Sequence, residues 1–259
     1  MKTVILCGGY GTRIRDVADD IPKPMIPVGR FPILWHLMKY YSTFGHTDFV
    51  LCLGYKGQVI KDFFLNYQAH TQDFTISLDN PDEIQFHSKN SELNWKVTLV
   101  ETGLDSMTGS RVKKIQSFVQ DAPFFLTYGD GLSNVDLTAL QSFHESKGKT
   151  LTVTGVRPPG RFGELQASND GLVTEFNEKP QASDGLISGG FFVCEPRIFE
   201  VLDNQDDLVF EQGPVRNLVS RKDMAVYRHD GFWQCMDTAR DWQLLNHLLQ
   251  SNQAPWKNW

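Results

Sequence analysis

Two kinds of hydrophobic pattern alternate along the first part of the chain. Unbroken apolar runs at residues 4–7 and 49–53 are typical of strands buried on both faces of a parallel sheet. Apolar residues recur every three or four positions over residues 32–44 and 59–64, which predicts amphipathic helices. Gly45 follows the first of these segments, where glycine commonly ends a helix. The order strand, helix, strand, helix predicts an α/β fold with a doubly wound, mostly parallel sheet.

The remaining elements extend this sheet, with one excursion. Further strands are predicted at residues 74–78, 95–100, 124–128, 151–156 and 186–194. Further helices are predicted at residues 111–119, 137–144, 210–220 and 242–249. Residues 80–94 are polar and poorly periodic, so we expect a small excursion there, and Asn169-Asp170-Gly171 is typical of a hairpin turn. No linker composition or internal repeat divides the chain, which predicts a single domain over residues 1–259.

Composition and charge exclude several classes of protein. The chain has 259 residues, of which 41% are hydrophobic and 22% charged, as in ordinary globular domains. Its 25 Lys and Arg against 31 Asp and Glu give a net charge of -6, so no general basic surface exists for nucleic acid or an anionic membrane. The four cysteines lack metal-ligand spacing, and neither a signal peptide nor an apolar run of about 20 residues occurs. These features predict a soluble cytoplasmic protein with reduced thiols.

A glycine-rich turn follows the first predicted strand and reads Gly8-Gly9-Tyr10-Gly11-Thr12-Arg13. Glycines at such a turn let backbone N–H groups approach and wrap phosphates. The dinucleotide pattern G-x-G-x-x-G and the P-loop pattern G-x-x-x-x-G-K-[ST] both fail here. Arg13 and Lys23 could neutralise a triphosphate, although an exposed glycine turn with stray surface charges is the alternative.

Six motifs in order along the chain resemble those of the sugar-1-phosphate nucleotidyltransferases. They are Gly8-Gly9-x-Gly11-Thr12-Arg13, Pro22-Lys23-Pro24-Met25, Tyr128-Gly129-Asp130-Gly131, Glu178-Lys179-Pro180, Gly189-Gly190-Phe191-Phe192-Val193 and Trp233-Gln234-x-Met236-Asp237-Thr238. The resemblance covers nearly the whole chain. It implies a Rossmann-like fold of the GT-A type, with a nucleotide-binding half over about residues 1–130 and a sugar-binding half over about residues 131–259.

Further features narrow the resemblance to the members of the family that use CTP and α-D-glucose 1-phosphate. These features are Ile33-Leu34-Trp35-His36, Gly54-Tyr55-Lys56-Gly57, Ser106-Met107-Thr108-Gly109-x-Arg111, Pro159-Gly160-Arg161-Phe162-Gly163 and Ala254-Pro255-Trp256-Lys257. The implied reaction is in-line attack of the sugar phosphate on the α-phosphorus of CTP, which gives CDP-glucose and pyrophosphate for cell-surface deoxysugar synthesis, such as that of the lipopolysaccharide O-antigen.

This chemistry explains why no nucleophilic His or Cys is required. A phosphate monoester has a second pKa of about 6 and is mostly a dianion at neutral pH, so it needs no strong general base. The charge that develops must instead be stabilised by Mg²⁺, Arg, Lys and backbone donors. Alternatives are the same reaction with UTP, dTTP or another hexose 1-phosphate, and a non-catalytic sugar-nucleotide-binding regulator. A GT-A glycosyltransferase is disfavoured because the chain has no D-x-D metal motif.

The resemblance also implies roles for individual residues. It assigns Mg²⁺ to Asp130 and Asp237, and catalysis to Arg13, Lys23 and Asp130. The nucleotide-binding residues are Leu6, Cys7, Gly8, Gly9, Tyr10, Gly11, Thr12, Arg13, Lys23, Gly103, Ser106, Arg111 and Gly129. The sugar-phosphate-binding residues are Gly163, Glu178, Lys179, Ser188, Gly189 and Trp233. Phe162 is a further candidate for the wall of the site, although a place in the buried core is favoured for it. A turn aspartate and a helix N-cap are the alternatives for Asp130 and Asp237.

Some positions depart from the family pattern. Ser188 stands where related enzymes usually carry Asn, whose amide both donates and accepts, so the identity of the sugar stays open. Cys235 replaces a proline and Cys7 a small alanine, as packing variation. Relatives in the family assemble into hexamers, so we expect a homo-oligomer, with residues 80–94 and the Trp-rich tail as candidate assembly surfaces.

Overall fold

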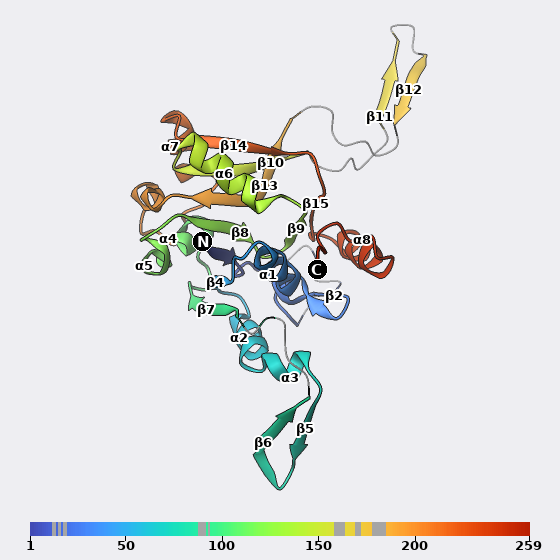
Figure 1. Ribbon diagram of the computed structural model, residues 1–259. Helices are drawn as coiled ribbons and strands as arrows, with labels where there is room; N and C mark the ends of the chain where they lie inside the picture. The colour runs from blue at the N-terminus through green and yellow to red at the C-terminus, as the bar shows by residue number, and fades with distance from the viewer. Residues whose placement is uncertain are drawn as a thin grey trace.

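A seven-stranded mixed sheet lies at the centre of the protein (Figure 1). The computed structural model describes residues 1–11, 14, 17, 20–87, 92, 94–157, 164–168, 172–177 and 185–259. The strands of the sheet are β1 (Lys2–Leu6), β4 (Asp48–Leu53), β7 (Lys96–Glu101), β8 (Phe124–Tyr128), β10 (Leu151–Val156), β13 (Ile187–Cys194) and β14 (Met224–His229). Their order is β14-β10-β13-β8-β1-β4-β7, and all neighbours are parallel except β13, which is antiparallel to both β8 and β10. The predicted α/β fold with a mostly parallel sheet is confirmed.

Two hydrophobic clusters cover the two faces of this sheet. Successive side chains of a strand point to opposite faces, and Val4 and Ile5 of β1, both fully buried, accordingly belong to different clusters. The helices are α1 (Ile33–Thr43), α2 (Gly57–Leu65), α3 (Tyr67–Thr71), α4 (Thr108–Lys114), α5 (Gln116–Val119), α6 (Leu137–Lys147), α7 (Gly213–Ser220) and α8 (Ala239–Gln250). The cluster with Ile5 includes Leu34 and Tyr41 of α1, and the cluster with Val4 includes Val112 of α4. Because apolar helices cover both faces, the strands can be apolar throughout.

Four short antiparallel pairs complete the fold. They are β2 (Pro27–Val28) with β3 (Phe31–Pro32), β5 (Phe74–Ser77) with β6 (Asn80–Phe86), β9 (Gly131–Ser133) with β15 (Trp233–Cys235), and β11 (Glu164–Ala167) with β12 (Val173–Asn177). The 3₁₀ segments η2 (Lys23–Met25) and η3 (Pro196–Val201) lie in connections. The β5–β6 and β11–β12 hairpins project away from the central sheet (Figure 1). The predicted turn at residues 169–171 lies outside the described residues, but the strands that flank it pair as a hairpin.

Two of the longer strands differ from the sequence expectation. The excursion expected over residues 80–94 contains β6, which pairs with β5 but is exposed along nearly its whole length. Since neither face of β6 is covered, it shows no alternation of apolar and polar residues. β14 was not predicted because it is an edge strand with only intermediate burial. No helix in the described part of the chain is long and apolar enough to cross a membrane.

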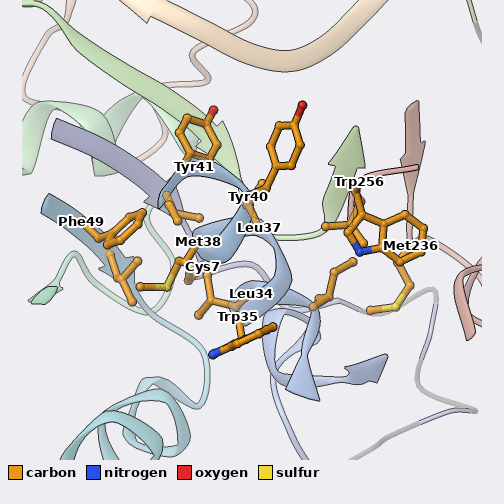
Figure 2. Packing of buried hydrophobic residues seen from close by; sticks show 14 of the residues in the cluster. Cys7, Leu34, Trp35, Leu37, Met38, Tyr40, Tyr41, Phe49, Met236 and Trp256 are labelled. Atoms are coloured by element: carbon orange, nitrogen blue, oxygen red, sulfur yellow. The ribbon is translucent and has the colours of Figure 1, made fainter. Parts of the chain in front are cut away.

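The C-terminal tail is anchored in the core by Trp256 (Figure 2). This side chain is fully buried, and its ring stacks on that of Phe232 with the centroids 5.6 Å apart. The indole Nε1–H donates to Nδ1 of His36 at 3.4 Å, and Nε2–H of His36 donates to the carbonyl of Val28 at 2.8 Å. An indole N–H only donates and a carbonyl only accepts, so His36 is neutral with its proton on Nε2. Burial lowers the pKa of His36 to about 4, consistent with this state.

We expect Trp256→Ala to lower the free energy of unfolding by about 3–5 kcal/mol, because it leaves a large cavity that the neighbouring rings cannot fill. Urea denaturation at fixed protein concentration measures the loss. Trp259→Ala is the matched control: Trp259 is 36% exposed, so its replacement should cost clearly less. Equal losses for the two variants would show that the tail is not anchored through Trp256.

Candidate active site

A cavity of about 450 Å³ opens at the carboxyl ends of β1 and β8. β1 pairs with β4 on one side and β8 on the other, so the direction in which the chain adds strands reverses at β1. Open α/β sheets bind ligands at the carboxyl ends of strands beside such a reversal. The cavity is lined by Leu6, Cys7, Gly8, Gly9, Tyr10, Gly11, Ile14, Lys23, Pro24, Leu104, Asp105, Ser106, Met107, Thr108, Arg111, Tyr128, Gly129, Asp130 and Asp237.

The structure brings most of the predicted nucleotide-binding residues together in this lining. All of those described lie there except Gly103, which is next to the lining residue Leu104. Thr12 and Arg13 lie outside the described residues. Several lining residues belong to none of the motifs found in the sequence, among them Leu104 and Asp105, which the fold places at the cavity from the segment before α4.

The glycine turn is held against its neighbours by backbone hydrogen bonds. The carbonyl of Gly8 accepts from the N–H of Tyr55 at 3.2 Å. The carbonyl of Leu6 accepts from the N–H of Gly129 at 3.0 Å. Gly11 has a φ of 60°, a left-handed conformation that glycine adopts without strain. Gly8 is required for another reason, since a Cβ there would lie 2.2 Å from Nη1 of Arg111.

Arg111 is buried behind this turn, and the terminal nitrogens of its guanidinium donate hydrogen bonds to oxygen atoms of the protein. Its Nη1 donates to the carbonyls of Leu53 and Gly103 and to the hydroxyl of Thr102 at 2.8–2.9 Å. Its Nη2 donates to the carbonyls of Gly8 and Leu104 at 3.0 and 3.1 Å. Burial lowers the pKa of Arg111, and no carboxylate pairs with it among the residues described. The guanidinium therefore joins the glycine turn to the ends of β4 and β7.

Lys23 lies at the other side of the cavity between two carboxylates. Its Nζ is 2.6 Å from Oδ2 of Asp130 and 2.5 Å from Oδ1 of Asp237. Although burial lowers the pKa of Lys23, the charges and hydrogen bonds of Asp130 and Asp237 raise it overall, so the ammonium stays charged. Three segments that are far apart in the sequence meet at this one atom.

Local structure explains how each of these side chains reaches the cluster. Lys23 begins the 3₁₀ segment η2 between two prolines. Asp130 occupies the turn between β8 and β9, and the pairing of Cys235 with Gly131 brings the strand that precedes Asp237 beside it. The N-cap of α8 is Thr238, in a capping box with Asp241, so the carboxylate of Asp237 is not the cap.

The donor set at this cluster fits Mg²⁺. Two carboxylates converge on one cation, and Mg²⁺ is commonly held by one or two carboxylates together with phosphate oxygens and water. No cluster of three or more His, Cys, Asp or Glu side chains suited to a metal occurs among residues with described positions. A metal held here would therefore complete its coordination with water and with phosphate oxygens.

The described members of the predicted sugar-binding set, Ser188, Gly189 and Trp233, lie near one another outside the cavity lining. Nε1 of Trp233 donates to the carbonyl of Gly189 at 2.7 Å, and Ser188 is exposed beside them. A Cβ on Gly190, where φ is 75°, would lie 2.4 Å from the ring of Tyr128, a lining residue of the cavity. The start of β13 is thus close to the cavity without lining it. Phe162, Gly163, Glu178 and Lys179 lie outside the described residues.

The loop before α7 supports the cavity wall from outside, which the sequence did not predict. The carbonyls of Asp206 and Leu208 accept from the N–H groups of Met107 and Gly109 at 2.8 and 2.9 Å. The Asp206 carboxylate accepts from the Ser106 hydroxyl at 3.1 Å and pairs with Lys114 at 2.5 Å. About 100 residues separate the two segments, so no local pattern could reveal this contact.

Comparison with known proteins adds three findings. Residues 2–238 match the family described as nucleotidyl transferase. Glucose-1-phosphate cytidylyltransferase of Salmonella typhimurium is 45% identical over 260 residues, and the probable glucose-1-phosphate cytidylyltransferase of Bacillus subtilis is 43% identical over 259 residues, each match covering all of both chains. Among solved structures, HddC from Yersinia pseudotuberculosis has a TM-score of 0.68 at 23% identity, covering 96% of this chain and 99% of its own. That structural likeness supports the fold alone.

We expect Gly8→Ala to lower the free energy of unfolding by about 1–3 kcal/mol, because the added methyl group overlaps the buried guanidinium of Arg111. Gly9→Ala is the matched control, since nothing lies within 4 Å of a Cβ there. Its effect should stay within about 0.5 kcal/mol. Urea denaturation of both variants gives the comparison, and equal stability of Gly8→Ala and Gly9→Ala would contradict the role assigned to Arg111.

Proposed function

Because this chain belongs to the nucleotidyl transferase family, we propose that it transfers the cytidylyl group of CTP to α-D-glucose 1-phosphate. The products are CDP-glucose and pyrophosphate. The observation that carries the proposal is the full-length identity of 45% to a relative of that name. The convergence of Lys23, Asp130 and Asp237 beside a glycine turn supports it, because this arrangement supplies charge where a nucleoside triphosphate would react.

In this reaction the residues of the site would position the two substrates and neutralise the negative charge of their phosphates. The sugar phosphate is already a nucleophilic dianion, so no side chain has to remove a proton from it. Backbone N–H groups of the glycine turn would hold the phosphates of CTP. The Lys23 ammonium would stabilise negative charge on the α-phosphate and on the departing pyrophosphate. Arg13, which belongs to the same motif, would assist.

Asp130 and Asp237 would hold Mg²⁺, the metal that we propose for this divalent-cation-dependent family. When bound there, the ion would offset charge on the phosphate oxygens. The Lys23 ammonium, which lies beside both carboxylates, would contribute a second positive charge.

We assign recognition of the sugar phosphate to Gly163, Glu178, Lys179, Ser188, Gly189 and Trp233. The hydrogen bond from Trp233 to the Gly189 carbonyl fixes the start of β13 beside Tyr128. The Ser188 hydroxyl is shorter than the Asn amide usual at this position, so its contact with the hexose would differ. Glucose is favoured because relatives at 43–45% identity carry glucose 1-phosphate in their names.

We propose that residues 1–259 act as one domain whose two halves bind the nucleotide and the sugar phosphate. Two observations support this proposal. β13, from the second half, pairs directly with β8 of the first, and Asp237 from the second half shares Lys23 with Asp130. From the resemblance we further propose a cytoplasmic enzyme that supplies CDP-glucose for deoxysugars of the cell surface, the lipopolysaccharide O-antigen among them.

The activity is tested by pyrophosphate release in Mg²⁺ across CTP, UTP, dTTP, ATP and GTP, each with several hexose 1-phosphates. We expect the highest kcat/KM with CTP and glucose 1-phosphate. Asp130→Asn and Asp237→Asn should each lower kcat by about 100-fold or more, because a carboxylate that holds the metal is lost. Asp121→Asn, an exposed residue outside the cavity, is the control and should turn over normally. A higher kcat/KM with another pair of substrates would contradict the proposed activity. Normal turnover of either variant would show that the replaced aspartate does not hold the metal.

We also propose a homo-oligomer, specifically a hexamer as the resemblance implies. The β5–β6 hairpin supports an assembly, because two-stranded hairpins are marginally stable alone and this one exposes Phe74, Ile76, Leu78 and Ile84. Light scattering after size-exclusion chromatography should give six times the mass of one chain. The double variant Ile76→Asp with Ile84→Asp should give a smaller species, whereas Val219→Asp on α7 should leave the mass unchanged. A monomeric wild type would contradict the assembly.

A further inference from the structure

One wall of the cavity carries polar side chains from residues 104–111, and contacts within the protein occupy most of their hydrogen-bonding capacity. Both terminal nitrogens of Arg111 donate to oxygen atoms of the protein. The Ser106 hydroxyl accepts from Lys114 at 2.7 Å and donates to Asp206 at 3.1 Å. The Thr108 hydroxyl accepts from the N–H of Phe210 and donates to Glu211, both within 2.9 Å. These side chains have little capacity left with which to read a nucleotide base.

Asp105 differs from its neighbours on this wall. Its side chain is exposed at the cavity, and the Tyr10 hydroxyl donates a hydrogen bond to Oδ1. Among described residues, no other side chain bonds to the carboxylate. A carboxylate only accepts and has two oxygens, so Oδ2 is available to a donor on a ligand. Asp105 thus presents an oriented acceptor to the cavity.

Tyr10 is suited to fix that orientation. It also lines the cavity, and its ring lies 5.1 Å from that of Tyr55, measured between centroids. The hydrogen bond to Asp105 and the charge of that carboxylate raise the pKa of Tyr10, so its hydroxyl remains a donor at neutral pH. The contact therefore persists under the conditions in which a nucleotide would bind.

Asp105 and Asp130 lie on opposite sides of the glycine turn in the order of the strands. Asp130 follows β8, and Asp105 follows β7, while β1 and β4 lie between these two strands in the sheet. The hydrogen bond from Tyr10 joins Asp105 directly to the glycine turn, so Asp105 lies on the cavity wall beside the turn that would hold the phosphates. With the phosphates on the glycine turn, the base reaches the wall that carries Asp105.

We propose that Asp105 selects the base by accepting a hydrogen bond from the exocyclic amino group of cytosine. Uracil and thymine carry a carbonyl oxygen at the same place, which would face the carboxylate as acceptor against acceptor. A carboxylate that accepts from the cytosine amino group is an established pairing in base recognition. The positive charge of Arg111 behind the wall offsets the repulsion between this carboxylate and the phosphates. The inference rests on the proposed function, because it assumes that CTP is the nucleotide.

The test measures kcat/KM for CTP and for UTP with glucose 1-phosphate in Mg²⁺. The Asn side chain of Asp105→Asn has nearly the same shape but no charge, and can donate to the uracil carbonyl. We expect the ratio of kcat/KM for CTP over UTP to fall by about 10- to 100-fold, the size of one specific base contact, mainly through KM. Tyr10→Phe keeps the ring but frees the carboxylate, so the KM for CTP should rise without a gain for UTP.

Asp207→Asn is the control for charge. Asp207 is exposed on the loop behind the wall and does not line the cavity, so its replacement should leave the ratio unchanged. Thermal unfolding of each variant verifies the fold. A wild type that prefers CTP, together with an unchanged ratio in Asp105→Asn, would overturn the inference and leave the proposed function intact. A wild type that prefers UTP, dTTP or a purine triphosphate would instead overturn the proposed function.

Discussion

The sharing of one lysine by two aspartates is the interaction on which the site depends. Two carboxylates that face the same space repel each other, and the ammonium of Lys23 offsets this repulsion at 2.6 and 2.5 Å. Removing one member of a partly buried group of charges leaves the others without full compensation, so the group is held by a rigid frame. The frame here consists of the β9–β15 pair, the capping box of α8 and the prolines around η2. Trp256 supports the same frame, since it packs on Phe232 and contacts His36 of α1.

A second buried cation organises the opposite side of the cavity by different means. Arg111 has no carboxylate partner among the described residues, and carbonyl oxygens at the ends of β4, β7 and the glycine turn accept its hydrogen bonds. The planar guanidinium can hold several acceptors at fixed angles, which a lysine could not do. This explains why Gly8 and Gly54 must lack side chains, because a Cβ on either would overlap Arg111. The glycines of the turn therefore serve the packing of the protein as well as the approach of phosphates.

The sequence predicted those features whose cause is local. Strands β1, β4 and β8 are continuous apolar runs because they are buried on both faces, and α1 shows its spacing because one side faces the sheet. Lys23, Asp130 and Asp237 lie in short motifs, so their positions could be anticipated, although their meeting at one atom depends on the β9–β15 pairing. β6 and β14 lack a covered face or lie at an edge and gave no clear pattern. The contacts of Asp206 and Glu211 with the cavity wall arise from tertiary packing between distant segments.

The two regions that we propose to bind the nucleotide base and the sugar phosphate are carried by different elements around one cluster of charges. The wall over residues 104–111 follows β7 and is supported by the loop before α7, whereas the start of β13 is held by Trp233. Neither element contributes a side chain to the group formed by Lys23, Asp130 and Asp237. Changes in one region can therefore alter the choice of base or of sugar without disturbing the reacting centre. Such a separation would permit relatives with other substrates. At 25–29% identity, relatives are named for the transfer of guanylyl groups to heptose or mannose phosphates.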